Sequence, residues 1–290
     1  MKRVSCLCLC LVTSPVWAWY AEGHRLITHR AVDILADPLP VFFIAGKETI
    51  AHCSVDPDVF KFKTDAGLLK DDEYPEHFFD LELFDDSVLP ANRTDFFFWC
   101  LRNSVYIQKI GTLPYALGEE TDRLTVAFAE YRRWPDNPVI QAKCLVYAGN
   151  LAHYAQDLCQ PLHTTIDYDG RANDNGASPR TGIHAKVDAL LGKLDAGRLP
   201  TITSTSIVVY DDLLSAILSE IQASHQQVDS VYALEAALPD ADDSSLLNSD
   251  SDVGKFAHQC LHASAQVTAS FFLTAWIKSE TIEIPSYHQR

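Results

Sequence analysis

The stretch LAHYAQDLCQPLHTT, residues 151–165, places three side chains that can bind a metal ion in an otherwise apolar, helix-like run. His153 and Asp157 are four residues apart, so on a helix they face the same way. Proline cannot comfortably continue a helix, so we expect this one to break at Gln160-Pro161. His163 follows just past the break, where it can reach a second metal ion beside the first.

A second His-x-x-x-Asp pair lies downstream, in TGIHAKVDALL, where His184 and Asp188 are four residues apart. One such pair alone is usually a surface ion pair or a capped core histidine. The residues around both pairs are apolar, however, and burying two ionisable pairs without a purpose is costly. Metal ligation would remove that cost. The two pairs therefore predict metal binding.

Two upstream segments offer further candidate ligands. YPEHFFDLELF contains His77 and Asp80 among aromatic residues, and HCSVDPDVFK contains Asp56 and Asp58 around a proline. A lone His77 is also compatible with a satisfied core histidine. The two aspartates are also compatible with ordinary turn chemistry around Pro57.

The spacing of apolar residues predicts an all-α fold. The chain has 290 residues, 47% of them hydrophobic, which is enough for one or two buried cores. Apolar residues recur at helical spacing, and no alternating strand pattern is sustained. Two polar stretches, 165–181 and 237–252, predict loops. We expect one mostly helical domain over residues 19–290, with helices at roughly 24–37, 95–109, 114–134, 138–160, 179–194, 209–236 and 252–280.

The N-terminal segment predicts export. Lys2 and Arg3 precede an apolar run, and Val16-Trp17-Ala18 offers acceptable residues for cleavage after Ala18. The run is too short to anchor the chain in a membrane. Residues 1–18 are therefore predicted to be a secretory signal peptide of a secreted or periplasmic protein. A short buried helix is the alternative interpretation.

Charge and cysteine content limit the function classes. The net charge of −16 becomes −18 without Lys2 and Arg3, so most of the surface repels nucleic acid and anionic lipid at long range. Five cysteines remain after residue 18, an odd number, so at least one is free or pairs between chains. No CxxC motif occurs, which disfavours a cysteine zinc site. We infer no protein partner and expect a monomer.

Cleavage after Ala18 would leave Trp19 as the first residue, with His24 close behind. A free α-amino group has a fairly low pKa, so a metal ion can deprotonate it. Together with the carbonyl oxygen of Trp19 it can chelate a metal.

Taken in order, these motifs resemble one known group. Trp-x4-His, an Asp, His-Phe-x-Asp, His-x3-Asp-x5-His and His-x3-Asp span Trp19 to Asp188 and resemble the zinc-dependent S1/P1 nuclease and phospholipase C superfamily. The resemblance implies a mostly helical domain that holds three Zn²⁺ ions in a cleft.

The resemblance also implies a role for each ligand. Asp58, His77 and His153 would hold one zinc ion, with Asp157 bridging to a second. That second ion would also take the amino nitrogen and carbonyl oxygen of Trp19 and the ring of His24. The third would be held by His163, His184 and Asp188. Asp58 is preferred to Asp56 because Lys61 then falls where the nuclease branch keeps a basic residue three positions after its Asp.

The chemistry implied is hydrolysis of a phosphate ester by zinc-activated water. Asp58 and Asp157 would serve it as ligands, and Lys61 would assist in binding the phosphate; a solvated surface lysine is the alternative for Lys61. Three Zn²⁺ and three aspartates leave the cleft positive by about three charges on an acidic protein.

Three features favour the nuclease branch. Its activity here would be hydrolysis of single-stranded DNA or RNA, with possible 3′-nucleotidase activity. The Trp19-to-His24 spacing is nuclease-like, and the last ligand is Asp188 where the bacterial phospholipases carry Glu. Phe78 and Asp80 also resemble the residues that stack on a base and bond its edge. Core packing is the alternative for Phe78.

Other features leave the substrate open. The interval from Asp58 to His77 is longer than in the fungal nucleases, and neither their second nucleotide pocket nor their disulfides can be matched. The aromatic run Phe96–Trp99 could face lipid, although it is better explained as a helix packed in the core. The alternatives are a phospholipase C acting on phospholipid head groups and a secreted, non-catalytic zinc-binding protein.

Overall fold

The computed structural model describes residues 19–35, 37–61, 67–199 and 207–288. Their secondary structure is helical, and over these ranges the only β contact is an isolated bridge between Tyr168 and Gly170. The expected all-α fold is confirmed. The α-helices are α1 Ala21–Asp33, α2 Val41–Ala45, α3 Lys47–Cys53, α4 Asp56–Phe60, α5 Gly67–Glu73, α6 Arg93–Asn103, α7 Ile107–Ile110, α8 Leu113–Arg133, α9 Pro138–Asp157, α10 Ile183–Asp188, α11 Leu213–His225, α12 Val228–Leu234 and α13 Asp252–Lys278. The 3₁₀ helices are η1 Tyr74–His77, η2 Leu81–Leu83, η3 Pro161–His163, η4 Leu191–Lys193, η5 Ala196–Arg198, η7 Glu235–Ala237 and η8 Ser279–Thr281.

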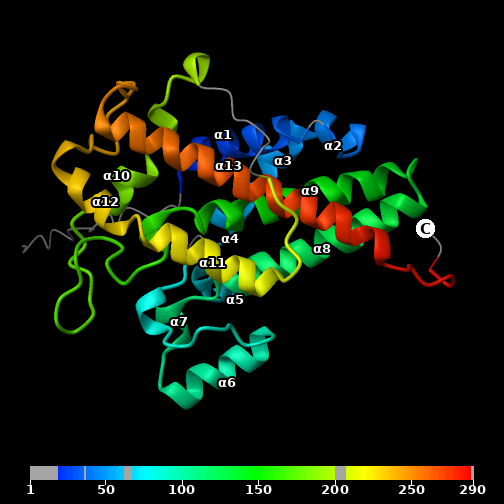
Figure 1. Ribbon diagram of the computed structural model, residues 1–290, viewed down its shortest axis with the longest axis horizontal. Helices are drawn as coiled ribbons and strands as arrows, with labels where there is room; N and C mark the ends of the chain where they lie inside the picture. Colours follow the sequence, from blue (N-terminus) through cyan, green and yellow to red (C-terminus); the bar gives the residue numbers. More distant parts are fainter. Residues whose placement is uncertain (1–18, 36, 62–66, 200–206, 289–290) are drawn as a thin grey trace, which may run out of the picture.

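Helix α9 is the centre of the bundle. It packs against α8 and α13, which run beside it in Figure 1, and also against α1 and α3. Helix α6 lies apart from these long helices, at the lower end of the molecule in Figure 1. A helix enclosed on several sides must be apolar around most of its circumference, and the second half of α9 is almost entirely buried.

The two ends of α9 follow from local sequence. Asn137 caps its start by accepting hydrogen bonds from the backbone N–H groups of Val139 and Ile140, and Pro138 occupies the first turn. The helix ends at Asp157, and Pro161 opens the short helix η3 that contains His163. The predicted break at Gln160-Pro161 is confirmed.

Two apolar clusters form the core, and the stretch 151–165 contributes to both. Leu151 and Leu158 belong to the larger cluster, which includes residues of α3, α8, α9 and α13. Leu162 belongs to a second cluster with Trp19 and Val187. The side chains of this stretch that could bind a metal therefore alternate with residues that pack in the two apolar clusters.

The predicted helices differ from the observed ones in four places. Within residues 41–61 and 67–73 lie four short helices, α2 to α5, that the apolar pattern did not reveal. The expected helix 95–109 is two helices, α6 and α7, separated at residues 104–106. The expected helix 209–236 is two helices, α11 and α12, separated at residues 226–227. The expected helix 179–194 is shortened to α10 and η4. These segments are too short to show a helical period, so packing rather than pattern sets their ends.

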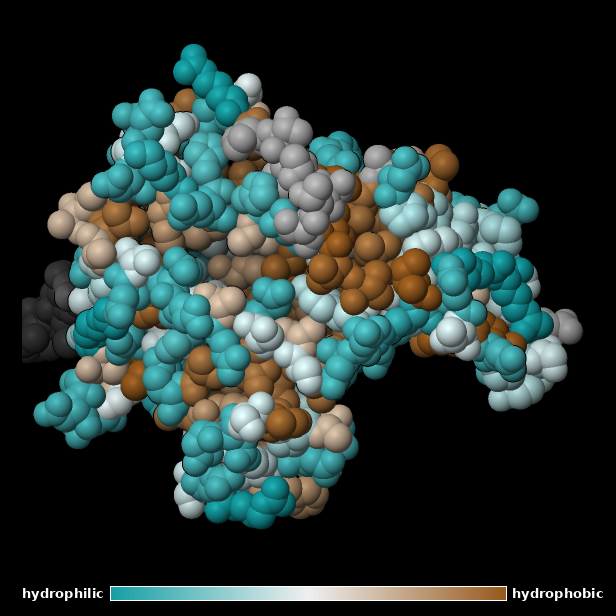
Figure 2. Space-filling view, viewed as in Figure 1, coloured by the Kyte–Doolittle hydropathy of each residue, from teal (hydrophilic) through white to brown (hydrophobic). Residues whose placement is uncertain are grey.

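The surface is mainly polar. On the face shown in Figure 2, hydrophilic side chains dominate, with an apolar patch around residues 207–210 beside α13, where Val208 and Val209 are exposed. Among the described residues, no helix is both long and apolar enough to cross a membrane. The predicted signal peptide lies outside the described residues.

Candidate metal centre

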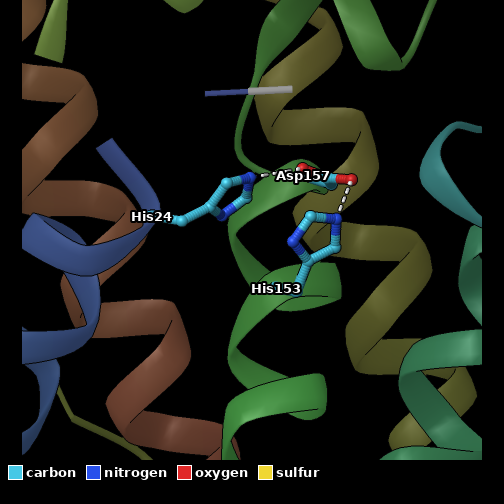
Figure 3. Close-up of side chains that lie close together, drawn as sticks. All are labelled: His24, His153 and Asp157. Atoms are coloured by element: carbon cyan, nitrogen blue, oxygen red, sulfur yellow. Dashed lines mark ion pairs between the residues drawn. The ribbon is translucent and has the colours of Figure 1, made fainter. Parts of the chain in front are cut away.

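The first candidate metal cluster joins α1 to the end of α9. It consists of His24, His153 and Asp157, all fully buried. Asp157 Oδ1 lies 3.5 Å from His24 Nε2, and its Oδ2 lies 3.3 Å from His153 Nε2 (Figure 3). The two imidazole rings stack with centroids 4.2 Å apart. The i, i+4 spacing on α9 therefore brings His153 and Asp157 together, as the sequence predicts, and α1 supplies the third group, His24.

A second cluster shares His153 with the first. It adds Asp58 from α4 and His77 from η1. Asp58 Oδ1 lies 3.9 Å from both His77 Nδ1 and His153 Nε2, and the two ring nitrogens are 2.9 Å apart. Asp157 Oδ2 is 2.9 Å from His77 Nδ1. One carboxylate thus reaches both clusters, an arrangement that suits a bridging ligand.

The third cluster lies at the end of η3 and along α10. His163 Nε2 faces His184 Nε2 at 3.1 Å, and Asp188 Oδ2 is 3.3 Å from the same His184 nitrogen. All three residues are buried. The structure therefore brings together the eight side chains that the sequence predicts as zinc ligands.

The opposite ring nitrogen of four histidines is occupied by protein. The Nδ1–H of His153 donates to the Ser54 carbonyl oxygen. The Nδ1–H of His163 donates to the His77 carbonyl oxygen, and that of His184 donates to the Tyr168 carbonyl oxygen. In His24 it donates to the Gln156 side chain, at 2.6 Å. The other nitrogen of each ring, Nε2, then carries no proton, and its lone pair is directed into a cluster. This is the tautomer that a metal ligand needs.

The clusters have the features expected of a site that holds cations. His24 Nε2, Asp58 Oδ2, Asp157 Oδ1 and Asp188 Oδ2 are buried and make no hydrogen bond within the described structure. His163 and His184 point two lone pairs at each other, which is repulsive unless a positive charge lies between them. Buried polar atoms without partners are rare and costly. Three metal ions would satisfy all of these groups.

Burial favours the neutral imidazole at three of the candidate ligand histidines. It lowers the pKa of His24 to about 4, that of His163 to about 3 and that of His184 to about 4. At His153 the nearby Asp157 and Asp58 raise the pKa despite burial. Metals bind the neutral imidazole, so the three lowered pKa values favour the ligand form.

Trp19 lies against the same centre. Its side chain is fully buried, and its indole N–H donates to the carbonyl of Gln156, the residue before Asp157. The backbone N–H of the next residue, Tyr20, donates to the Asp188 carbonyl. The backbone of Trp19 is thus held between the residues that carry two of the candidate ligands.

Lys61 is near the clusters rather than in solvent. Its ammonium nitrogen lies 2.5 Å from Asp58 Oδ1 and 3.5 Å from His77 Nδ1, and the side chain is largely buried. Asp56, the other candidate for the Asp58 role, is only half-buried and belongs to none of the three clusters.

The predicted base-binding pair lies beside the second cluster. The Phe78 side chain is half-buried, and its ring contacts Tyr74 edge-on with centroids 5.7 Å apart. Asp80 is buried, and burial together with nearby Glu82 raises its pKa to about 8. Of the aromatic run, Phe96 and Trp99 are buried, but Phe97 and Phe98 are exposed, so its expected core packing holds for only half of it.

Several supporting residues were not found from the sequence. Glu73 accepts a hydrogen bond from the Tyr154 hydroxyl and faces His77. Gln160 donates to Asp188 Oδ1, and Asp169 accepts backbone hydrogen bonds at the start of α10. The two glutamines, Gln156 and Gln160, lie inside the quoted stretch. Their polarity in an apolar run was the available signal.

Comparisons with known proteins give a limited result. No family model matches the chain, and no curated protein matches it. Among solved structures, the alpha toxin of Clostridium absonum is similar over 93% of this chain and 68% of its own, with 15% identity and a TM-score of 0.47. The alpha toxin of an avian strain of Clostridium perfringens is similar over 92% and 67%, with 15% identity and a TM-score of 0.45.

Proposed function

We propose that this protein is a zinc-dependent phosphoesterase. The observation that carries the proposal is the convergence of five imidazoles and three carboxylates in three buried clusters, with lone pairs directed inward. Histidine nitrogen and carboxylate oxygen without thiolate are ligands that zinc accepts. Several zinc ions close together suit phosphoryl transfer, because both the attacking and the leaving oxygen can be stabilised.

The chain's own residues would hold and orient the substrate. When bound, zinc supplies Lewis acidity and lowers the pKa of water. Asp157 lies between two clusters and would keep their charges at a fixed separation. Lys61, at the edge of the second cluster, can place its ammonium on a phosphate oxygen as a point charge. The burial of the ligands excludes bulk water and strengthens these interactions.

The negative charge of the chain favours a substrate that carries a single phosphate ester and no further negative groups. At −16, the protein repels a nucleic-acid backbone or an anionic membrane at long range. Two basic residues near the second cluster already have carboxylate partners, Lys61 with Asp58 and Arg93 with Glu76. A zwitterionic phospholipid such as phosphatidylcholine meets no such repulsion.

Apolar side chains near the second cluster support the same substrate. Helix α4 carries Asp58 and also the exposed Val59 and Phe60, and α5, which packs beside it, carries Leu68 at 90% exposure. Tyr74, at the start of η1, is 53% exposed. A patch of exposed apolar side chains marks a surface that can bind a protein or a membrane. We therefore propose a phospholipase C type of reaction on phospholipid head groups.

Single-stranded nucleic acid is the second candidate. The half-buried ring of Phe78 and the buried carboxyl of Asp80 support it, because a base can stack on the one and bond the other. The net charge of the chain opposes it.

We also propose that cleavage after Ala18 frees the Trp19 amino group as a ligand and that the protein is exported. The buried position of Trp19 beside Gln156 supports this. N-terminal sequencing of the exported protein tests it, and a first residue other than Trp19 would remove this ligand.

The deciding experiment is a paired assay on zinc-loaded protein that begins at Trp19. We expect phosphorylcholine release from phosphatidylcholine vesicles, abolished by a chelator and restored by zinc. Cleavage of single-stranded DNA or RNA instead, weakened by Phe78→Ala at unchanged zinc content, would establish the second candidate. Full zinc loading with neither substrate hydrolysed would contradict both and leave a zinc-binding protein.

The apolar side chains provide a second test. Leu68→Asp should lower hydrolysis of vesicles about tenfold or more, because a lost apolar contact with lipid costs about 1.5–3 kcal/mol. Hydrolysis of a dispersed short-chain phospholipid should stay unchanged. Val139→Asp is the matched control, because Val139 is 75% exposed but lies at the far end of α9. Equal effects of the two substitutions would argue against a lipid-facing role for α5.

A further inference from the structure

His77 differs from the other candidate ligand histidines in what backs its ring. In the other four, the nitrogen that faces away from the cluster donates to an uncharged carbonyl or amide oxygen. In His77, Nδ1 faces Asp58 and Asp157, while Nε2 is buried and makes no hydrogen bond. A buried ring nitrogen without a partner is unusual.

The group nearest to that nitrogen is a carboxylate. Glu73 Oε1 lies 3.5 Å from His77 Nε2, slightly beyond a good hydrogen bond. Glu73 ends α5 and is only 7% exposed, although the residue before it, Asp72, is exposed. The chain therefore turns one acidic side chain inward at this point, towards the ring of His77.

Glu73 is held by a residue of the central helix. The Tyr154 hydroxyl donates to Glu73 Oε1 at 2.5 Å, and Tyr154 directly follows the ligand His153 on α9. Tyr154 is buried, and its ring contacts those of both His77 and His153. One tyrosine thus ties the carboxylate to the helix that carries two candidate ligands.

We propose that Glu73, held by Tyr154, is a positioning residue for His77 that fixes the ring with Nδ1 directed at the cluster. The proposal rests on the proposed zinc function. A carboxylate behind a ligand imidazole selects the tautomer and makes the coordinating nitrogen more basic. Since the other four rings are backed by uncharged oxygens, the metal held by Asp58, His77 and His153 should depend on Glu73, and the other two should not.

Zinc retention tests the proposal without any substrate. Zinc-loaded wild-type protein, Glu73→Gln, Glu73→Ala and Tyr154→Phe are dialysed against increasing chelator, and zinc per chain is measured by mass spectrometry. We expect both Glu73 variants to release one zinc ion of the three at 10- to 100-fold lower chelator than wild type. Tyr154→Phe should shift the same ion in the same direction, by less.

Asp72→Asn is the matched control, because it removes an exposed carboxylate one residue away on the same helix. A merely structural role for Glu73 would lower the unfolding temperature of the zinc-free protein and leave zinc release unchanged; that outcome overturns the proposal. Glu73→Gln keeps the size of the side chain and decides the matter if Glu73→Ala does not fold.

The outcomes also separate this proposal from the proposed function. Wild-type protein that holds three zinc ions but hydrolyses no phosphate ester contradicts the function, and zinc release still decides the role of Glu73. Wild-type protein that takes up no zinc overturns both. Three zinc ions released equally from wild type and from Glu73→Gln overturn the role of Glu73 alone.

Discussion

Each candidate ligand is a side chain that would be unfavourable where it lies without a metal. Asp157 and Asp188 are fully buried, as is His153. Moving an ion of this size from water into a protein interior costs several kcal/mol even after relaxation. Partial pairing between these groups offsets some of that cost, but it leaves the inward oxygen of each carboxylate unpaired. Metal binding is the simplest physical reason for keeping them.

Asp58 and Asp56 lie two residues apart, and comparing them tests whether the buried carboxylate is kept for metal binding. Asp58→Asn should remove at least one zinc ion per chain and lower phosphoesterase activity 100-fold or more, because Asp58 is buried in a cluster. Asp56→Asn should keep all three ions, because Asp56 is half-exposed and outside the clusters. Metal analysis of the two purified variants is the measurement. Zinc lost from Asp56→Asn but retained by Asp58→Asn would reverse the assignment.

Asp80 gives a prediction in pH. Burial and Glu82 raise its pKa to about 8 in the folded protein, whereas an unfolded Asp titrates near 4. The folded state therefore binds the extra proton, and stability falls as pH rises between these two values. Asp80→Asn removes this loss, so relative to wild type the variant should gain on the order of 2 kcal/mol between pH 6 and pH 9. Urea unfolding at the two pH values measures it, and a pH-independent difference would contradict the raised pKa.

At the scale of elements, the close approach of α3 and α9 sets the position of Asp58. A Cβ atom on Gly149 of α9 would lie 2.4 Å from Cys53 Cβ and 2.9 Å from the Ile50 carbonyl oxygen, so only glycine fits there. Cys53 ends α3, and α4 with Asp58 begins three residues later. A shift of α3 would therefore move a candidate ligand.

Gly149→Ala should destabilise the protein by about 1–3 kcal/mol, the usual cost of overpacking, and should weaken zinc binding. Gly118→Ala is the matched control, because a Cβ there meets only the Ile217 Cδ1 atom, at 3.9 Å, in the interior of α8. That change should stabilise by about 0.5–1 kcal/mol, since alanine loses less conformational entropy in a helix. Chemical denaturation and metal analysis compare the two. Similar behaviour of both variants would refute the close-packing argument.

The helices that were missed have a common cause. The segments α2 to α5 are five to seven residues long, and such short helices do not show a full apolar period. Long helices such as α8 and α13 were predicted within a few residues, because their patterns extend over several turns. No proline or glycine lies between α11 and α12, so the local sequence does not predict the break between them.

For the whole molecule, the metal centre joins segments that are far apart in the chain. The candidate ligands come from α1, α4, η1, α9, η3 and α10, so metal binding should link segments spread from residue 24 to residue 188. Removing zinc would leave buried carboxylates without counter-charge in a chain that already carries −16.

Chelation should therefore lower the unfolding temperature strongly. At a zinc concentration 100 times Kd, each independent site adds about 2.7 kcal/mol. For a domain of this size the loss of three sites corresponds to a fall on the order of 10–20 °C. Scanning calorimetry with and without chelator measures the change, and added zinc, but not magnesium, should restore it. An unfolding temperature that chelator leaves unchanged would refute a structural contribution of the metals.

The sequence by itself determined the helical class, the break at Gln160-Pro161 and the two His-x-x-x-Asp pairs, because these depend on spacing along one segment. His153 with Asp157 and His184 with Asp188 are pairs one helical turn apart, and this proximity needs no tertiary contact. Only the tertiary structure placed Asp58 in a buried cluster, Phe97 and Phe98 in solvent, and Glu73 and Tyr154 behind His77. The reason is physical: burial and long-range contacts depend on how separate helices pack, and the short helices at residues 56–77 carry too few turns for a local pattern to encode them.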